Sequence, residues 1–225
     1  MKSWKYWLIP VVGMLFLAPF TPYLDLGIAG FFHKMCEKNI DHFITNDFTD
    51  FMYIWGIIPA QMVFLGTLIG YLFSFLIPKL KSARVHFLFL FLVLAIGSGF
   101  VTNWVLKDHW GRARPKQLAR YGGTAEFRAF YEPNIFGENY QKYKSFPCGH
   151  CTMGFYFLAF VPLGWRLRSR SISLLGWIVG LGLGFLIGFS RMAEGGHFLS
   201  DVLSGGLVMW LSALAVDYLV YEDFV

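Results

Sequence analysis

The chain has 225 residues, of which 56% are hydrophobic, with a mean hydropathy of +0.52 and a formal net charge of +5. Such an apolar chain, about one domain long, indicates a membrane protein rather than a soluble domain with a large core. The basic excess is divided between short loops and one long polar segment, so we attribute it to membrane topology and an anionic ligand and expect no nucleic-acid partner. Three cysteines, Cys36, Cys148 and Cys151, exclude a dense disulfide framework.

The apolar runs predict an all-α integral membrane protein, a single domain over residues 1–225 that crosses the bilayer with six transmembrane helices. We expect the spans at residues 7–24, 51–77, 85–106, 151–165, 172–189 and 202–220. The fourth of these is short for a span. The first contains Pro10, Pro19 and Pro22, and no small-residue cleavage site clearly follows it. We therefore interpret it as a retained, kinked span and not as a signal peptide.

Two features between and within the spans carry structural expectations. Residues 25–50 mix aromatic and aliphatic side chains with charges, which predicts an amphipathic segment at the membrane interface. The fifth span has a glycine at every fourth position, namely Gly176, Gly180, Gly184 and Gly188. Such a stripe of small residues predicts close packing against neighbouring helices.

The number of spans determines which polar segments share a side of the membrane. Six spans put both termini on the side that also receives two short basic loops, with Lys79, Lys81, Arg84, Arg166, Arg168 and Arg170. The excess of positive charge marks this side as cytoplasmic. The opposite side receives residues 25–50, 107–150 and 190–201. The middle one is itself basic, but long segments count less in this rule.

Residues 190–201 read Ser-Arg-Met-Ala-Glu-Gly-Gly-His-Phe-Leu-Ser-Asp. The Gly195-Gly196 pair predicts a tight turn, because glycine tolerates positive φ. If a helix restarts after this turn, His197 and Asp201 lie one turn apart on one face. The carboxylate can then bind one imidazole nitrogen and leave the other as a nucleophile. The same spacing is also common in purely structural hydrogen bonds.

Two further polar stretches fall on the same side, residues 107–115 after the third span and residues 147–150 before the fourth. With residues 190–201 they supply four cations and a second imidazole: Lys107, Arg112, Arg114, Arg191 and His150. Cations near span ends are costly in lipid and commonly functional, although surface arginines also bind lipid head groups without catalysis. Fixed cations, one nucleophilic imidazole and one acid fit phosphoryl transfer through a phosphohistidine.

The three stretches resemble the signature motifs of the type 2 phosphatidic acid phosphatase superfamily, the lipid phosphate phosphatases. Its pattern is Lys-x6-Arg-Pro, then Pro-Ser-Gly-His, then Ser-Arg-x5-His-x3-Asp. The first and third motifs fit, but Cys148 stands where the family has serine. The resemblance implies that His197 attacks phosphorus, Asp201 orients it and His150 protonates the leaving oxygen. It implies no metal and no cofactor. The expected phosphate site comprises Lys107, Arg114, Arg191, Cys148 and Gly149, to which we add Arg112.

Residues 107–112, Lys-Asp-His-Trp-Gly-Arg, resemble the bacterial branch of the family that removes phosphates from lipid A. The resemblance therefore implies an anionic phospholipid or glycolipid substrate, with lipid A dephosphorylated at its 1- or 4'-position as the first expectation. Undecaprenyl diphosphate and phosphatidylglycerol phosphate are the alternatives. The expected location is the bacterial inner membrane, with the active site at the periplasmic helix ends.

Other interpretations remain open at this point. Cys148-Gly149-His150-Cys151 is also a Cys-x-x-Cys motif, which suits a membrane thiol–disulfide oxidoreductase, although Cys36 alone cannot supply the usual second pair. The two cysteines could equally form a structural disulfide or fill space as small apolar side chains. A zinc site from Cys148, Cys151, His150 and His197 is formally possible, but the nearby cations would repel the metal. A non-catalytic lipid-binding or transport protein would not need the two histidines and the aspartate.

Overall fold

The computed structural model describes residues 4–36, 43–135, 137 and 140–222, and its regular structure is helical. Five helical stretches are long and apolar enough to cross a membrane: Lys5–Met35, Asp47–Phe73, Pro78–Lys107, Arg170–Ala193 and Leu199–Tyr221. Each contains most or all of one of the spans expected from the sequence. The expectation of an all-α membrane protein is therefore confirmed for these five.

The first stretch is longer than expected. It runs through α1 (Lys5–Leu17), η1 (Ala18–Phe20) and α2 (Thr21–Met35). The prediction that residues 25–35 belong to a separate interfacial segment is wrong. Pro19 and Pro22 lie in the first turns of η1 and α2, where a missing N–H costs no helical hydrogen bond, so the helix continues through them. One face of α2 is buried, formed by Thr21, Asp25, Ala29 and Phe32. Residues 37–42 of the predicted segment lie outside the described residues.

The second and third membrane-length stretches pack against each other through α4 and α5. They comprise α3 (Asp47–Trp55) and α4 (Ile58–Phe73), then η2 (Pro78–Ala83), α5 (Arg84–Val93) and the π-helical η3 (Leu94–Lys107). The second begins before the expected residue 51 because Asn46 and Thr49 form a capping box. The Thr49 N–H donates to the Asn46 side chain at 2.9 Å, and the Asn46 N–H donates to the Thr49 hydroxyl at 3.0 Å.

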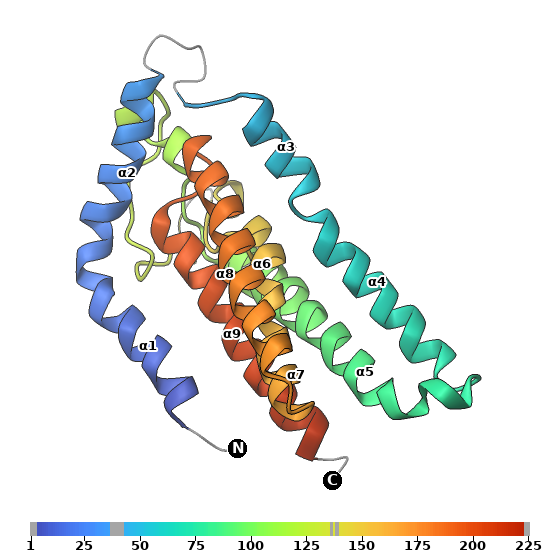
Figure 1. The fold of residues 1–225 in the computed structure, drawn as a ribbon. Coiled ribbons are helices and arrows are strands. Elements are labelled where there is room, and N and C mark those ends of the chain that lie inside the picture. Colours follow the sequence, from blue (N-terminus) through green and yellow to red (C-terminus); the bar gives the residue numbers. More distant parts are fainter. Residues whose placement is uncertain (1–3, 37–42, 136, 138–139, 223–225) are drawn as a thin grey trace.

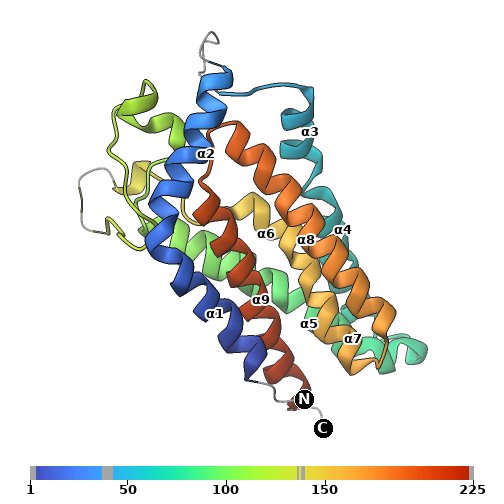
Figure 2. The same cartoon turned by 60° about the vertical axis from the view of Figure 1, so that its left-hand side comes forward.

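The expected fourth span is a continuous helical run that is not among the five membrane-length stretches. It consists of α6 (Gly149–Phe155), η7 (Tyr156–Ala159) and α7 (Phe160–Arg166). Pro162 provides no N–H, and its ring crowds the carbonyl of Leu158. That crowding accounts for the tightened turn of η7. The run lies alongside α8 (Arg170–Ala193), as Figures 1 and 2 show.

The glycine stripe of α8 is the surface against which this run packs. A Cβ at Gly176 would lie 2.8 Å from the backbone nitrogen of Val161, and one at Gly180 would lie 2.7 Å from that of Leu158. A Cβ at Gly184 would come within 2.4 Å of the Phe155 ring. Any side chain here would push the helices apart, so the predicted packing role of the stripe is confirmed.

Helix α9 (Leu199–Glu222) is central, since 61% of its most apolar stretch is buried against 6–39% in the other four membrane-length stretches. The start of α1 and the end of α9 lie at one end of the bundle (Figures 1 and 2). The opposite end gathers the starts of α6 and α9, the end of α8 and the long polar segment. Within that segment lie η4 (Pro115–Gln117), η5 (Ala119–Tyr121) and η6 (Tyr140–Lys142).

A second apolar cluster fastens the long segment to the helix ends. Its buried members are Ala29, Phe32, Phe43, Ala113, Leu118, Tyr121, Ala125, Ala193 and Phe198. They come from α2, the chain before α3, the long segment, the end of α8 and the turn before α9. Burial of these side chains brings together polar residues that are far apart in the sequence.

Candidate active site

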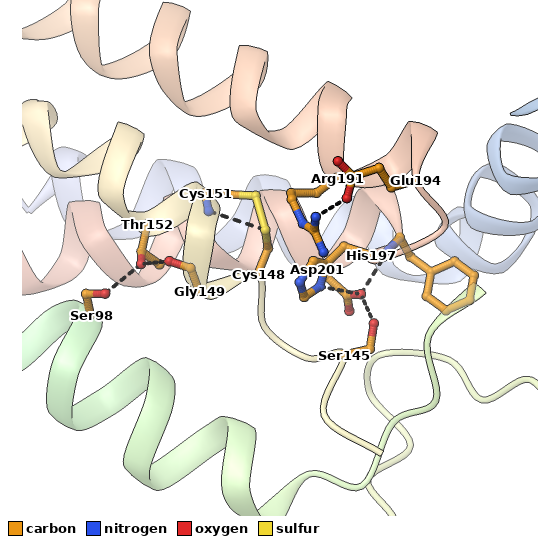
Figure 3. Close-up of a disulfide and its surroundings, with 11 residues drawn as sticks. Ser98, Ser145, Cys148, Gly149, Cys151, Thr152, Arg191, Glu194, His197 and Asp201 are labelled. Carbon is orange, nitrogen blue, oxygen red and sulfur yellow. Dashed lines mark hydrogen bonds and ion pairs between the residues drawn. A yellow bond between two sulfur atoms is a disulfide. The ribbon is translucent and has the colours of Figure 1, made fainter. Parts of the chain in front are cut away.

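The turn between α8 and α9 has the tight geometry that its glycines predict. Gly195 has a φ of +61°, in the left-handed region, and a Cβ there would lie 2.7 Å from the Phe43 ring. A Cβ at Gly196 would lie 2.6 Å from the guanidinium of Arg191. The N–H groups of Gly196 and His197 donate to the Arg191 carbonyl at 2.9 and 3.3 Å. The turn thereby folds His197 back beside Arg191 (Figure 3).

His197 faces Asp201 across the first turn of α9. The two are not on one helical face as expected, because α9 begins at Leu199 and His197 precedes it. Nδ1 of His197 lies 3.5 Å from Oδ2 of Asp201, which is long for a hydrogen bond. The carboxylate therefore approaches the Nδ1 side of the ring and not Nε2. The same carboxylate oxygen accepts hydrogen bonds from the Ser145 hydroxyl at 2.6 Å and the Phe198 N–H at 2.9 Å (Figure 3). Asp201 is thus held rigidly beside the imidazole.

Burial keeps the His197 imidazole neutral. It lowers the pKa of His197 to about 4, and the charges of Lys107 and Arg191 lower the pKa further, while Asp201 raises it. His150 lies outside the five membrane-length stretches and stacks on the Tyr53 ring at a centroid distance of 4.6 Å. Its burial, with the nearby charge of Arg191, lowers the pKa of His150 to about 4 as well. Two neutral imidazoles therefore face a cluster of cations.

Three of the predicted cations converge on these histidines. Lys107, at the end of η3, is close enough to Arg114 and Arg191 for their charges to repel. A Cβ on Gly149 would lie 3.2 Å from Nζ of Lys107, so the start of α6 faces this lysine. Arg191 pairs with Glu194 and lies 4.7 Å above the Tyr53 ring. Among the described residues nothing accepts a hydrogen bond from its buried Nε. The cluster is suited to an anion with several oxygens.

A polar cavity of about 660 Å³ opens beside this cluster. Its lining includes both arginines, Arg114 and Arg191, together with Tyr53, Lys116 and Glu194. A second, apolar cavity of about 530 Å³ lies between α1 and the helices α8 and α9 and contains none of the predicted site residues. Of these two cavities, the polar one brings several cations together beside room for a ligand head group.

The sequence profile of the PAP2 superfamily matches residues 87–224, more than half of the chain. The chain belongs to the PAP2 superfamily. It is accordingly a phosphatase, a hydrolase of phosphoric esters. This confirms the family that the three motifs resemble.

Among curated proteins, the lipid A 4'-phosphatase of Francisella tularensis subsp. novicida is 34% identical over 207 residues, covering 89% of this chain and 88% of that protein. The lipid A 4'-phosphatase of Rhizobium etli is 32% identical over 126 residues, or 55% of this chain and 44% of its own length. The lipid A 1-phosphatase of Rhizobium johnstonii is 34% identical over 119 residues, with 52% and 41% covered. No solved structure shows a significant match to this PAP2 chain.

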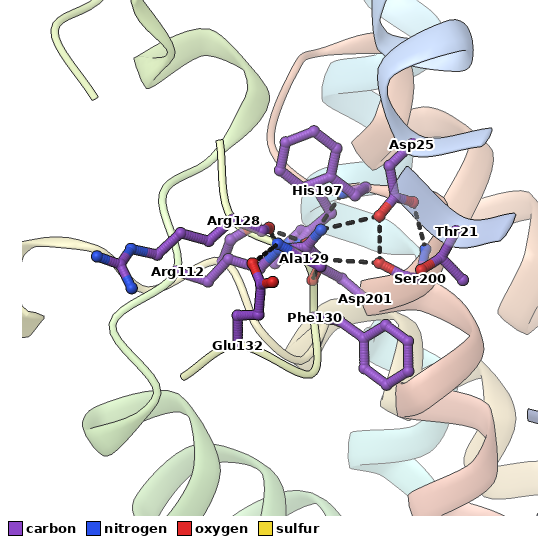
Figure 4. Close-up of polar contacts among 12 residues, drawn as sticks. Thr21, Asp25, Arg112, Arg128, Ala129, Phe130, Glu132, His197, Ser200 and Asp201 are labelled. Atoms are coloured by element: carbon purple, nitrogen blue, oxygen red, sulfur yellow. Dashed lines mark hydrogen bonds and ion pairs between the residues drawn. The ribbon is translucent and has the colours of Figure 1, made fainter. Parts of the chain in front are cut away.

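Arg112 does not occupy the position that we expected in this PAP2 site. Its guanidinium is buried and every nitrogen donates to protein: Nε to the Arg128 carbonyl at 3.0 Å, Nη1 to Ser200 and Asp201, and Nη2 to Asp25 (Figure 4). Its charge is engaged by two carboxylates, so the geometry does not support direct binding of phosphate. Buried arginine is stabilised by such pairing, and nothing in the sequence near residue 112 indicates a carboxylate partner.

Cys148 also departs from its expected role. It forms a disulfide with Cys151, and both residues are fully buried. A disulfide sulfur has no hydrogen to donate, and the Cys148 N–H already donates to the Asp201 carbonyl at 3.1 Å. The expected phosphate contact from Cys148 is therefore wrong for this state of the protein. The same burial argues against a thiol–disulfide oxidoreductase, because a partner thiolate must reach a sulfur atom. It also removes both cysteines from the zinc alternative.

Four residues at this end of the bundle were not predicted from the sequence. Ser145 and Asp25 join the network around Asp201, and Tyr53 and Glu194 surround Arg191. Glu194 lies inside the third motif at a variable position, and Ser145 lies two residues before the second, so proximity to the motifs was an available signal for these two. Asp25 and Tyr53 come from helices with no recognisable motif.

Proposed function

We propose that this protein removes a phosphate from lipid A at the periplasmic face of the bacterial inner membrane, through a phosphohistidine on His197. The observation that carries the proposal is the neutral, buried imidazole of His197 between a fixed carboxylate and three cations. The match to a lipid A 4'-phosphatase across 89% of the chain supports the substrate.

In the first step, Nε2 of His197 attacks phosphorus and the bond from phosphorus to the sugar oxygen breaks. The imidazole gains positive charge as the new bond forms. Asp201, on the Nδ1 side at 3.5 Å, stabilises that charge, and this separation can shorten to a hydrogen bond when substrate binds. Ser145 and the Phe198 N–H hold the carboxylate in place, so it does not need to reorganise during the reaction.

His150 supplies the proton to the leaving oxygen. With a pKa of about 4 in the ligand-free site, it is neutral at pH 7. The neighbouring cations contribute to that low value, and a bound phosphate dianion offsets their charge. Substrate binding therefore raises the proton affinity of His150, which takes up a proton from solvent and can then act as the acid. In the second step the now neutral His150 accepts a proton from a water molecule. The oxygen of that water attacks phosphorus, and the bond from phosphorus to Nε2 of His197 breaks.

The phosphate is held by Lys107, Arg114 and Arg191, and Arg112 acts on Asp201 instead. Arg191 exchanges its carboxylate partner, Glu194, for the phosphate, which also satisfies the unpaired Nε. Because these cations neutralise the charge that develops in the transition state, we expect the reaction to need no metal.

The location follows from the topology that we propose. If α6, η7 and α7 together form a sixth crossing, the basic loops at η2 and between α7 and α8 lie on the cytoplasmic side, with the start of α1 and the end of α9. The cation cluster then faces the periplasm. Figures 1 and 2 are consistent with this arrangement, because these loops lie at the end of the bundle away from the start of α6.

The test is phosphate release by the purified protein in detergent from lipid A, undecaprenyl diphosphate and phosphatidylglycerol phosphate. Mass spectrometry of the lipid A product separates loss at the 1-position from loss at the 4'-position. We expect lipid A to be the preferred substrate and the 4'-phosphate to be removed, as in the relative that covers most of this chain.

His197→Ala should abolish the release, and His109→Ala, at an exposed histidine in the long segment, is the matched control that should retain it. Preference for another lipid phosphate would refute the substrate. Activity of His197→Ala above a few per cent of wild type would refute the nucleophile.

A further inference from the structure

Three buried charges from distant parts of the chain form one network (Figure 4). Arg112 donates from Nη2 to Asp25 Oδ2 at 2.8 Å and from Nη1 to Asp201 Oδ1 at 2.5 Å. All three side chains are at most 1% exposed. Two carboxylates thus share one guanidinium, away from water, and the second of them faces His197.

Ser200 connects the two ends of the network. Its N–H donates to Asp25 Oδ1 at 2.9 Å, and its hydroxyl donates to Asp25 Oδ2 at 2.6 Å. The same hydroxyl accepts from Arg112 Nη1 at 2.8 Å. Asp25 therefore contacts the residue directly before Asp201 as well as the arginine that holds Asp201. Its position is determined by three hydrogen bonds with good geometry.

Asp25 lies on α2, before residues 87–224 that the PAP2 profile matches, so membership of the family assigns it no role. Thr21, Asp25, Ala29 and Phe32 make the buried face of α2. Three of the four are neutral, and a buried charge on such a face is costly unless something requires it.

We propose that Asp25 is a positioning residue for catalysis: through Arg112 and Ser200 it sets the orientation and the effective negative charge that Asp201 presents to His197. This rests on the proposed function, in which His197 is the nucleophile. The N-terminal stretch then completes the active site, in addition to spanning the membrane.

The physical reason is the sharing of one positive charge. With Asp25 ionised, the charge of Arg112 is divided between two carboxylates, and Asp201 keeps much of its negative charge for the imidazole. With Asp25 neutral, Arg112 compensates Asp201 alone. The developing imidazolium of His197 is then less stabilised, and the imidazole becomes a weaker base and nucleophile.

The test is Asp25→Asn, which retains size and shape and removes the charge. We expect kcat to fall by about tenfold with KM unchanged, because no phosphate ligand is altered. We also expect the acidic limb of the profile of kcat/KM against pH to move to lower pH, by about half a unit or more. The other charged or titratable groups that face His197 are Asp201, Lys107, Arg191 and His150, and all remain in this variant.

Asp217→Asn is the matched control. Asp217 is, like Asp201, on α9, and it accepts two hydrogen bonds from Arg166, at 2.9 and 2.8 Å. This pair lies at the far end of the helix from His197. This variant should retain the kcat and the pH profile of wild type. Asp25→Glu, which restores the charge, should recover part of the activity lost in Asp25→Asn.

If Asp25→Asn does not fold, as judged by thermal unfolding in detergent, Ser200→Ala tests the positioning role of Asp25 instead. It removes one hydroxyl between Asp25 and Arg112 and leaves all charges in place. We expect a loss in kcat of about threefold or more, with KM unchanged. If the folded variants keep the kcat and acidic limb of wild type, the positioning role is wrong. If wild type itself releases no phosphate from any lipid, the proposed function has failed instead.

Discussion

The disulfide between Cys148 and Cys151 closes a ring of four residues around Gly149 and His150, with a sequence separation of three. Cys151→Ala opens this ring. In the chain-entropy description, a ring of this size stabilises the folded state by about 2 kcal/mol at 25 °C. For a chain of this length, each 1 kcal/mol changes the melting temperature by about 2–4 °C, so we expect a decrease of about 4–8 °C.

In Cys151→Ala, we expect kcat to change less than the melting temperature does. The Cys148 N–H donates to the Asp201 carbonyl, and the Thr152 hydroxyl donates to the Gly149 carbonyl at 2.6 Å and bonds to Ser98 at 2.7 Å (Figure 3). These contacts hold the start of α6 without the disulfide. We therefore expect less than about a tenfold loss in kcat at 25 °C, from looser placement of His150.

Thermal unfolding of the protein in detergent, followed by intrinsic fluorescence, measures the first quantity, and phosphate release measures the second. Reductant present during the scan should reach the sulfur atoms once unfolding exposes them, so it should lower the melting temperature of wild type and leave that of Cys151→Ala unchanged. Cys36→Ser, at the half-buried free cysteine, is the control and should melt like wild type in both conditions. Coincident melting of oxidised wild type and Cys151→Ala would show that the disulfide does not constrain the chain.

Four further outcomes are expected. Ser145→Ala removes a 2.6 Å hydrogen bond to the Asp201 carboxylate. Such a bond to a charged group contributes about 1.5–3 kcal/mol, so kcat for phosphate release should fall about 10- to 150-fold. An unchanged kcat would show that Asp201 does not need this hydrogen bond. Glu194→Gln removes the carboxylate that competes for Arg191, so inhibition by inorganic phosphate should become tighter by about tenfold, and weaker inhibition would contradict the exchange of partners. The acidic limb of the profile of kcat/KM against pH should lie near pH 4, because the buried His197 has a pKa of about 4 and its protonation removes the nucleophile; an acidic limb centred at 6.5 would place the imidazole in water. Chelators should leave activity unchanged, and a loss that zinc restores would indicate a metal site instead.

Local sequence determined the membrane-length helices and the pairing of His197 with Asp201. Apolar length alone located five of the expected spans, because crossing a bilayer requires a run of apolar residues that no other arrangement needs. The stripe from Gly176 to Gly188 predicted close packing against neighbouring helices, since close approach requires the absence of side chains. Gly176, Gly180 and Gly184 face the run of α6, η7 and α7, and Gly188 faces Val202 on α9. The spacing of His197 and Asp201 brought the two within 3.5 Å, even though the helix starts after the histidine.

Tertiary structure alone decided the roles of the residues around that pair. Arg112 has the same local pattern as the neighbouring Arg114, yet it turns inward, because a carboxylate on α2, 87 residues away, is buried beside it. The N–H of Cys148 is likewise engaged within the protein, because it donates to the carbonyl of Asp201, 53 residues away, at 3.1 Å. Whether a polar side chain meets substrate or protein depends on what packs next to it. That partner is set by helices far apart in the chain, and local sequence does not encode it.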